Sequence, residues 1–292
     1  MDQSIFYIHP VTYREVATTM SKRKFFHDFT KIVGDIYLRN DLAKDPRNIT
    51  KALLRRSPNG VVRGYGALAI RGFSLLTNDW EPIVGVPELK HEVKTQKGKI
   101  LRREEPENVL RRGDVKLVDH YQALRDVFSL HGLNKFEEQV ALIDHLGRQN
   151  HQLIPGLQGK QGFEEHRGFV NIFAESPPES IVRVRLYQAG MWSFFPQLRV
   201  DYQDAHYFLD LGDPLSRIAI EYNGAWHYNS DTRAKDSLRK NALKNVGWDV
   251  YEITAKIVNN QVLWERFLAE IRRARDRKLA ERRRRLPIST VD

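Results

Sequence analysis

The sequence predicts an α/β (α+β) protein of two domains, in which a core of the order helix, three strands, helix, strand follows a mixed α/β region. The length of 292 residues suggests two domains. A hydrophobic content of 41% and a charged content of 29% are typical of a globular chain. In the second half, segments with helical apolar spacing alternate with short strand-like segments that end at glycine or aspartate.

The first half mixes short helices and strands. The segment 25–41 is interpreted as a helix or turn followed by the strand DIYL. The turn-rich stretch IPGLQGKQG at 154–162 marks the domain boundary. We therefore predict a mixed α/β domain over 1–160, with helices over 48–56, 65–76, 120–132 and 134–149 and strands over 81–88, 99–105 and 114–119.

The second half follows a clearer order. Ser176 at the N-cap, Pro177 at the first helical position and Gly190 at the end predict a helix. The elements that follow it complete a predicted domain over 166–265: a β-hairpin over 195–212, a strand over 217–224, a helix over 231–247 and a strand over 248–254.

Two carboxylates lie at the centre of the predicted sheet. Asp210 falls in the strand FLDLG, and Glu221 follows in the strand IAIEYNG. A short turn joins the two strands, so both side chains can share one face, and hard cations such as Mg²⁺ or Mn²⁺ prefer such oxygen ligands. The backbone carbonyl of Tyr222 could add an oxygen, and Asn223 shares the face of Glu221. His227 follows the glycine turn and can reach back toward the same face.

These parts fit metal-dependent phosphodiester hydrolysis. A bound metal polarises a phosphoryl oxygen and lowers the pKa of a bound water, and His227 can orient that water. Taken singly, each residue has a simpler explanation: Asp210 as an edge residue, His227 as a packing residue, Glu221 as the partner of an arginine. Two carboxylates at the inner ends of paired strands destabilise the folded state unless a cation neutralises them. This favours the interpretation that Asp210 and Glu221 together form a cation site.

The order of these motifs resembles a known family. Asp210, IAIEYNG, WH, a charged helix and GWDVYEIT resemble the PD-(D/E)xK nuclease superfamily and, more narrowly, the branch of the very-short-patch repair endonuclease, over about residues 172–256. The resemblance implies a restriction-endonuclease-like core and a divalent-metal nuclease with Asp210 and Glu221 as metal ligands. Asn223 stands where the superfamily has a lysine. The repair branch also lacks this lysine and uses histidines, so His227 is expected to compensate.

Four further residues are candidates for this site or for its nucleic acid. In the family, a glutamate of the opening helix often points into the site, which would be Glu179 here; the same residue also fits a capping box, and both interpretations stay open. Gln197, in the predicted first strand, is a second candidate. Arg233 and Arg239 could bind phosphate, or they could be solvated or paired with Asp236.

The basic charge is concentrated at the C-terminal end. The net charge is +10, and the segment 266–285 holds ten Lys/Arg against three acids, which is +7 of that total. One interpretation of the region 266–292 is a solvated, frayed helix. The other is an arm that contacts the phosphates of double-stranded DNA, with Arg272, Arg273, Arg283 and Arg284 as the contacting residues.

The first half resembles a second family. The segments GDIYLRND, YGALAIRGF and VDHYQALRDVFS are similar to the antitoxin of a bacterial abortive-infection system. This resemblance implies a region that places the chain on DNA or on a protein partner.

Composition limits the remaining classes. The chain has no Cys, so disulfide scaffolds and thiolate metal sites are excluded. It shows no signal-peptide pattern and no apolar run of the roughly 20 residues that span a bilayer, so we expect a cytoplasmic protein that does not bind membranes.

The expectation is a Mg²⁺-dependent DNA endonuclease or nickase, acting in defence against foreign DNA or in repair, with a homodimer allowed. A catalytically inactive DNA-binding regulator and an RNA-cleaving enzyme are the alternatives.

Overall fold

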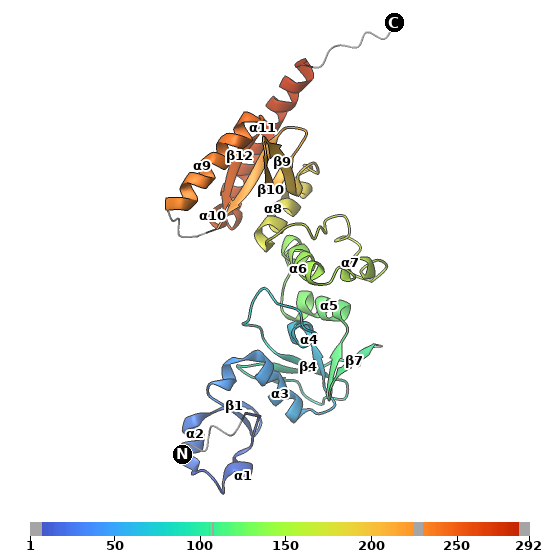
Figure 1. Ribbon diagram of the computed structural model, residues 1–292. Helices are drawn as coiled ribbons and strands as arrows, with labels where there is room; N and C mark the ends of the chain where they lie inside the picture. Colours follow the sequence, from blue (N-terminus) through green and yellow to red (C-terminus); the bar gives the residue numbers. More distant parts are fainter. Residues whose placement is uncertain (1–7, 105, 107, 225–229, 286–292) are drawn as a thin grey trace. The chain divides into compact units, whose positions relative to one another are not determined.

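The described residues of this computed structural model form three β-sheets flanked by helices, so the chain is of the mixed α/β class (Figure 1). The structure describes residues 8–104, 106, 108–224 and 230–285, with side chains in the last range from 236 to 284. The chain divides into two compact units. Unit 1 comprises residues 1–134 and 159–162, and unit 2 comprises residues 135–158 and 163–292.

Unit 1 is built on a two-stranded sheet and a six-stranded sheet of order β5-β6-β4-β3-β8-β7. Its elements are α1 (Tyr13–Val16), α2 (Lys22–Asp28), β1 (Phe29–Val33), β2 (Ile36–Arg39), the 3-10 helix η2 (Leu42–Lys44), α3 (Pro46–Arg56), β3 (Val61–Arg63), α4 (Gly64–Ile70), β4 (Ile83–Val86), β5 (Val93–Lys94), β6 (Lys99–Arg102), β7 (Val109–Arg112), β8 (Val115–Val118) and α5 (His120–Leu130).

Several elements of unit 1 differ from the sequence prediction: the helix predicted over 65–76 ends at Ile70, and strands β5 and β7 were not predicted. The segment FTKIV was interpreted as the end of a helix or turn, but it forms strand β1, which pairs antiparallel with β2. Its β-branched residues Ile32 and Val33 enter the core with Ile36 and Leu38. Strand propensity and burial therefore outweigh the helical start at α2.

Unit 2 contains the helix, three strands, helix, strand order that the sequence predicts. Its elements are α6 (Phe136–Gln149), α7 (Leu153–Gly156), α8 (Pro177–Gln188), β9 (Phe195–Tyr202), β10 (Ala205–Asp213), β11 (Ile218–Asn223), α9 (Ser230–Asn245), β12 (Asp249–Thr254), α10 (Ala255–Val258) and α11 (Gln261–Arg285). The strands form one sheet of order β12-β11-β10-β9, with β11 and β12 parallel and the other pairs antiparallel.

The sheet of unit 2 is covered on both faces, which makes three layers. On one face, Leu186 of α8 and Phe267 of α11 share a core with Leu211 and Ile220. On the other face, Leu243 of α9 packs with other apolar residues, chiefly Val200, Leu209, Ala219 and Trp248. Within α9, Leu243 is fully buried against the sheet, whereas Leu238 is 68% exposed.

Both ends of unit 2 differ from the limits of 166 and 265 predicted for the second domain. Helix α6 belongs to unit 2, where Asp144 pairs with Arg183 of α8, so the predicted boundary at 154–162 falls after a helix that packs with the C-terminal unit. The basic segment is also no separate tail from 266. Helix α11 runs without a break from Gln261, and its residues Trp264, Phe267, Ile271 and Ala274 belong to the core.

Among the described residues, no helix combines the length and apolar character needed to cross a membrane.

Candidate active site

A row of four polar residues crosses the sheet of unit 2. Glu221 of β11 is directly paired with Glu252 of β12. Asp210 lies one step beyond the pair Leu211–Ile220, which places it opposite Glu221 on β10. Gln197 falls opposite Asp210 on β9, because the pairs on either side of these two residues are in register. The sheet therefore brings Asp210 and Glu221 side by side at its centre.

Asp210 carries the strongest electrostatic perturbation of the site. Burial raises the pKa of its carboxyl to about 7, and the charges of Glu221 and Glu179 act in the same direction. The backbone amide of Tyr222 donates to Oδ2 of Asp210 at 2.8 Å and opposes this shift. Nearby carboxylates that raise the pKa of a partly buried acid are characteristic of sites that hold a proton or a cation.

Glu221 is held by Arg239 from helix α9. Nη1 and Nη2 of Arg239 donate to the two carboxylate oxygens at 2.9 and 3.0 Å, and Nη2 also donates to the Phe208 carbonyl at 2.6 Å. The exposed fractions are 28% for the Arg239 side chain and 15% for Glu221. The expectation that Arg239 is solvated or paired with Asp236 is therefore wrong, because helix α9 turns this guanidinium onto the sheet, where a two-pronged contact with a half-buried carboxylate is stronger than an exposed pair.

Glu179 contacts the start of α8, but not through the N-cap amide that a capping box uses. Its Oε1 accepts from the Ser176 hydroxyl at 2.6 Å, and its Oε2 accepts at 2.9 Å from the amide of Glu175, one residue before the N-cap. Its charge also contributes to the raised pKa of Asp210. Gln197 donates from Nε2 to Glu179 at 3.4 Å. Its φ of 51° is uncommon for a residue other than glycine, and such positions cluster at functional sites.

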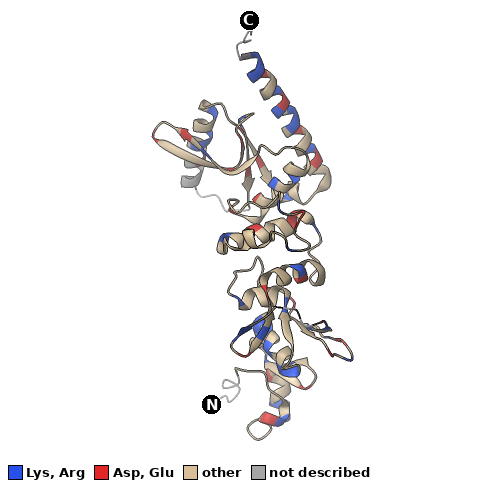
Figure 2. Cartoon of the chain, turned by 90° about the vertical axis from the view of Figure 1, so that its right-hand side faces the viewer, with Lys and Arg blue, Asp and Glu red and all other residues tan. Residues whose placement is uncertain are grey.

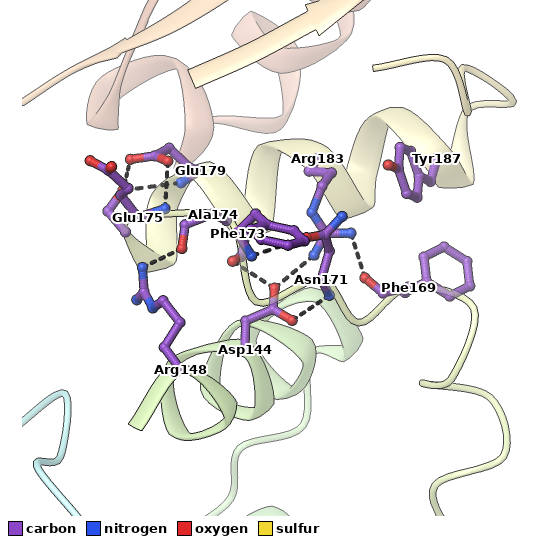
Figure 3. A network of polar contacts seen from close by, with 12 residues as sticks. Asp144, Arg148, Phe169, Asn171, Phe173, Ala174, Glu175, Glu179, Arg183 and Tyr187 are labelled. Atoms are coloured by element: carbon purple, nitrogen blue, oxygen red, sulfur yellow. Dashed lines mark hydrogen bonds and ion pairs between the residues drawn. The ribbon is translucent and has the colours of Figure 1, made fainter. Parts of the chain in front are cut away.

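A buried network fixes the helix that carries Glu179 (Figure 3). Asp144 of α6 accepts from Arg183 of α8 at 2.7 Å and from the Ser180 hydroxyl at 2.7 Å, and both ionic side chains are almost fully buried. The Asn171 amide donates to the other oxygen of Asp144. Because so many bonds converge on one carboxylate, α8 has a fixed position against α6, and Glu179 is held near the sheet.

Asn223, Glu252 and Lys240 form a second polar group beside the acidic row. Nδ2 of Asn223 donates to Glu252 at 3.5 Å, and Lys240 of α9 contacts the other oxygen of the same carboxylate. With Glu221 and Arg239 they line an open pocket of about 610 Å³. The sequence analysis missed Glu252 and Lys240. Strand alternation indicates that Glu252 faces α9, but no sequence signal fixes the parallel register that puts it next to Glu221.

Several candidate residues do not contribute to the described geometry. His227 and the side chain of Arg233 lie outside the described residues. The contact that the structure gives for Tyr222 is through its amide, whereas its carbonyl had been expected to bind a metal. Arg272, Arg273, Arg283 and Arg284 are exposed on α11 and belong to a different part of unit 2.

The oxygens of Asp210 and Glu221 are the donor type that Mg²⁺ prefers, and Mg²⁺ commonly takes only one or two carboxylates with water in its other positions. Burial, and after it the charge of Glu221, raises the pKa of Asp210, and a bound cation would relieve the repulsion between these two carboxylates. Within the described part of the chain, no group of three or more His, Cys, Asp or Glu side chains is placed to hold a metal. The donor set therefore fits a two-carboxylate site in which Arg239 competes for Glu221.

Comparison of the chain with protein-family models, with curated proteins and with solved structures found no match.

Proposed function

We propose that unit 2 is a divalent-metal-dependent endonuclease or nickase of DNA, with a restriction-endonuclease-like core. The observation that carries the proposal is the pairing of Asp210 with Glu221 on neighbouring strands, with the pKa of Asp210 raised to about 7. Two carboxylates placed side by side at the centre of a sheet destabilise the fold through burial and repulsion, and a bound cation would offset this cost. Their geometry matches a cation site for phosphodiester cleavage.

In this proposal, a divalent cation held by Asp210 and Glu221 would polarise the scissile phosphate and make a bound water more acidic. Asp210 gives up its proton on binding. Glu179 and Gln197 hold the position of the row through their hydrogen bond, and Arg239 orients Glu221. The same proposal includes contacts with DNA and membership of the repair-endonuclease branch. It also includes a cytoplasmic location and a role in defence or repair.

One observation favours a different function. Arg239 already neutralises Glu221 through two hydrogen bonds, so the chain supplies its own cation where a metal would bind. Asn223 stands in place of the lysine of the superfamily and cannot carry a charge. A catalytically inactive DNA-binding regulator that uses the same fold is therefore the second candidate.

The deciding experiment measures nicking of supercoiled plasmid with Mg²⁺ or Mn²⁺. We expect Asp210→Ala and Glu221→Ala to abolish cleavage while duplex binding persists, because both remove metal ligands and neither touches the basic helix. Asp201→Ala is the matched control, since this acid lies in the same hairpin and is 63% exposed. Equal nicking by wild type and both site variants would refute the nuclease.

Calorimetry with Mn²⁺ separates the two candidates. A nuclease site binds Mn²⁺ in a manner that depends on Asp210, whereas an inactive regulator does not bind it there. A parallel arm with RNA in place of the plasmid tests the RNA-cleaving alternative, which predicts preferential loss of the RNA substrate.

A further inference from the structure

Eight of the ten Lys and Arg residues of helix α11 fall into two sets of four. Four of them face the body of unit 2, where their polar atoms are occupied. Arg275 pairs with the fully buried Asp213 at 2.9 Å, and Lys278 with Asp249 at 3.0 Å. The others in this set donate to backbone carbonyls: Arg272 to that of Ala189 and Arg282 to those of Pro214 and Leu215.

The second set forms a straight line on the exposed side. Arg266, Arg273, Arg277 and Arg284 are spaced by seven, four and seven residues, so at 3.6 residues per turn they fall within about 20° of one line along the helix. All four are exposed, and none has an ion pair or side-chain hydrogen bond to any residue that the structure describes. Figure 2 shows Lys and Arg spread along α11. We call these four residues the arginine line.

The acids of α11 lie beside the arginine line and leave it unbroken. Glu270 and Glu281 are displaced by about 40–60° toward the core side of the helix, and Asp276 and Glu265 by about 80–100° the other way. Each is therefore adjacent to the line without interrupting it. From Arg266 to Arg284 the line spans 18 residue steps, which at a rise of 1.5 Å per residue is about 27 Å.

We propose that the arginine line is a docking surface for the phosphate backbone of a nucleic-acid duplex, which lies along α11. A duplex carries about one charge per 1.7 Å of its axis and is stiff, so a straight row of guanidinium groups about 27 Å long meets phosphates along its whole length. Arginine is suited to this contact because its planar fork donates two parallel hydrogen bonds to a phosphate.

An anionic membrane is the competing partner, and α11 does not suit it. A helix that lies on a membrane needs bulky apolar residues beside its basic face. The bulky apolar residues of α11, such as Trp264, Phe267 and Ile271, are buried in the core of unit 2. Next to the arginine line stand Val262, Ala269 and Ala280, which are too small and too few for insertion.

The inference rests on the proposed nucleic-acid role of the chain but not on cleavage. It is therefore tested without divalent cations, in a full-length Asp210→Asn background, by fluorescence anisotropy with a short DNA duplex between 50 and 200 mM salt. Each phosphate contact contributes about 0.9 to the slope of log affinity against log salt. Four contacts predict a loss of affinity of about 150-fold over this range, and two contacts predict about 12-fold.

The test variant is Arg273→Gln with Arg277→Gln, and the control is Lys244→Gln with Lys256→Gln. Both pairs remove two charges from exposed positions of unit 2, but Lys244 of α9 and Lys256 of α10 lie outside α11. For the test pair, we expect the loss of affinity between 50 and 200 mM salt to fall from about 150-fold to about 12-fold. For the control pair, we expect this loss to stay at about 150-fold. Circular dichroism checks that both pairs fold.

Three outcomes would overturn the inference: equal effects of the two pairs, tighter binding to a single strand of the same length than to the duplex, or equal competition by vesicles of anionic phospholipid. A duplex of RNA in a second arm distinguishes the two sources of the same phosphate backbone. Because no step of the measurement involves cleavage, a failed nuclease assay leaves the result intact, and the reverse also holds.

Discussion

Asp210→Asn is expected to stabilise the protein at alkaline pH. The pKa of this carboxyl is about 7 in the folded chain against an ordinary value of 3.8. Between these values the folded state binds more protons than the unfolded state, so wild-type stability falls as the pH rises through this window. At about 1.4 kcal/mol for each pH unit, the full effect is about 4 kcal/mol, and partial exposure of the side chain reduces it.

The substitution removes the titrating group and keeps the local geometry. The Asn carbonyl oxygen can still accept from the Tyr222 amide, which donates to Asp210 at 2.8 Å. The unfolding free energy of Asp210→Asn relative to wild type should therefore rise by about 2 kcal/mol between pH 5 and pH 8. Urea denaturation at both pH values measures the difference. Asp201→Asn is the control, because that exposed acid should change stability by less than about 1 kcal/mol at either pH.

Two results would refute the reasoning. If the difference between Asp210→Asn and wild type is the same at both pH values, the carboxyl does not titrate as the geometry requires. If Asp210→Asn is less stable than wild type at pH 8, the hydrogen bond from the Tyr222 amide to the Asp210 carboxylate contributes more to stability than the carboxylate charge costs. Repeating the pH 8 series with Mg²⁺ separates the metal from the proton: the cation should stabilise wild type, by about 2.7 kcal/mol at a hundred times its dissociation constant, and should not stabilise the variant.

Three further predictions concern the same unit. Arg239→Gln should tighten Mn²⁺ binding measured by calorimetry, because the guanidinium no longer competes for Glu221; weaker binding would mean that Arg239 assembles the site. Glu221→Gln should lower the pKa of Asp210, followed by NMR titration, because it removes a repelling charge and releases Arg239 toward Asp210; an unchanged pKa would leave burial as the whole cause. Asp144→Asn should cost about 3–5 kcal/mol in urea denaturation, since it leaves Arg183 buried without its partner charge; a loss below about 1 kcal/mol would show that the network is dispensable.

The sequence is most informative where local signals and burial agree. Ser176, Pro177 and Gly190 predict α8 because capping and helix-ending are local effects, and the helix forms with Ser176 as its N-cap. The short turn between β10 and β11 leaves little freedom in pairing, so the adjacency of Asp210 and Glu221 follows from alternation in neighbouring strands.

Other features depend on contacts between distant parts of the chain. Arg239 reaches Glu221 across 18 residues only because α9 packs on one face of the sheet, and its side-chain direction is set by that packing. Glu252 joins the row through a parallel pairing that no local pattern specifies. The network of Asp144 with Arg183 links segments 39 residues apart, which is why α6 was predicted to precede the domain to which it belongs.

Charges of one sign are concentrated at two places in unit 2. At the acidic row, carboxylates are close together, and the sheet tolerates them because Asp210 can hold a proton and Arg239 neutralises Glu221. On α11, arginines that face the body meet a carboxylate or carbonyls, and those of the arginine line meet only solvent in the described structure. A cation relieves the first excess of charge and a polyanion relieves the second, and the proposed metal-dependent nuclease would bring both to the same chain.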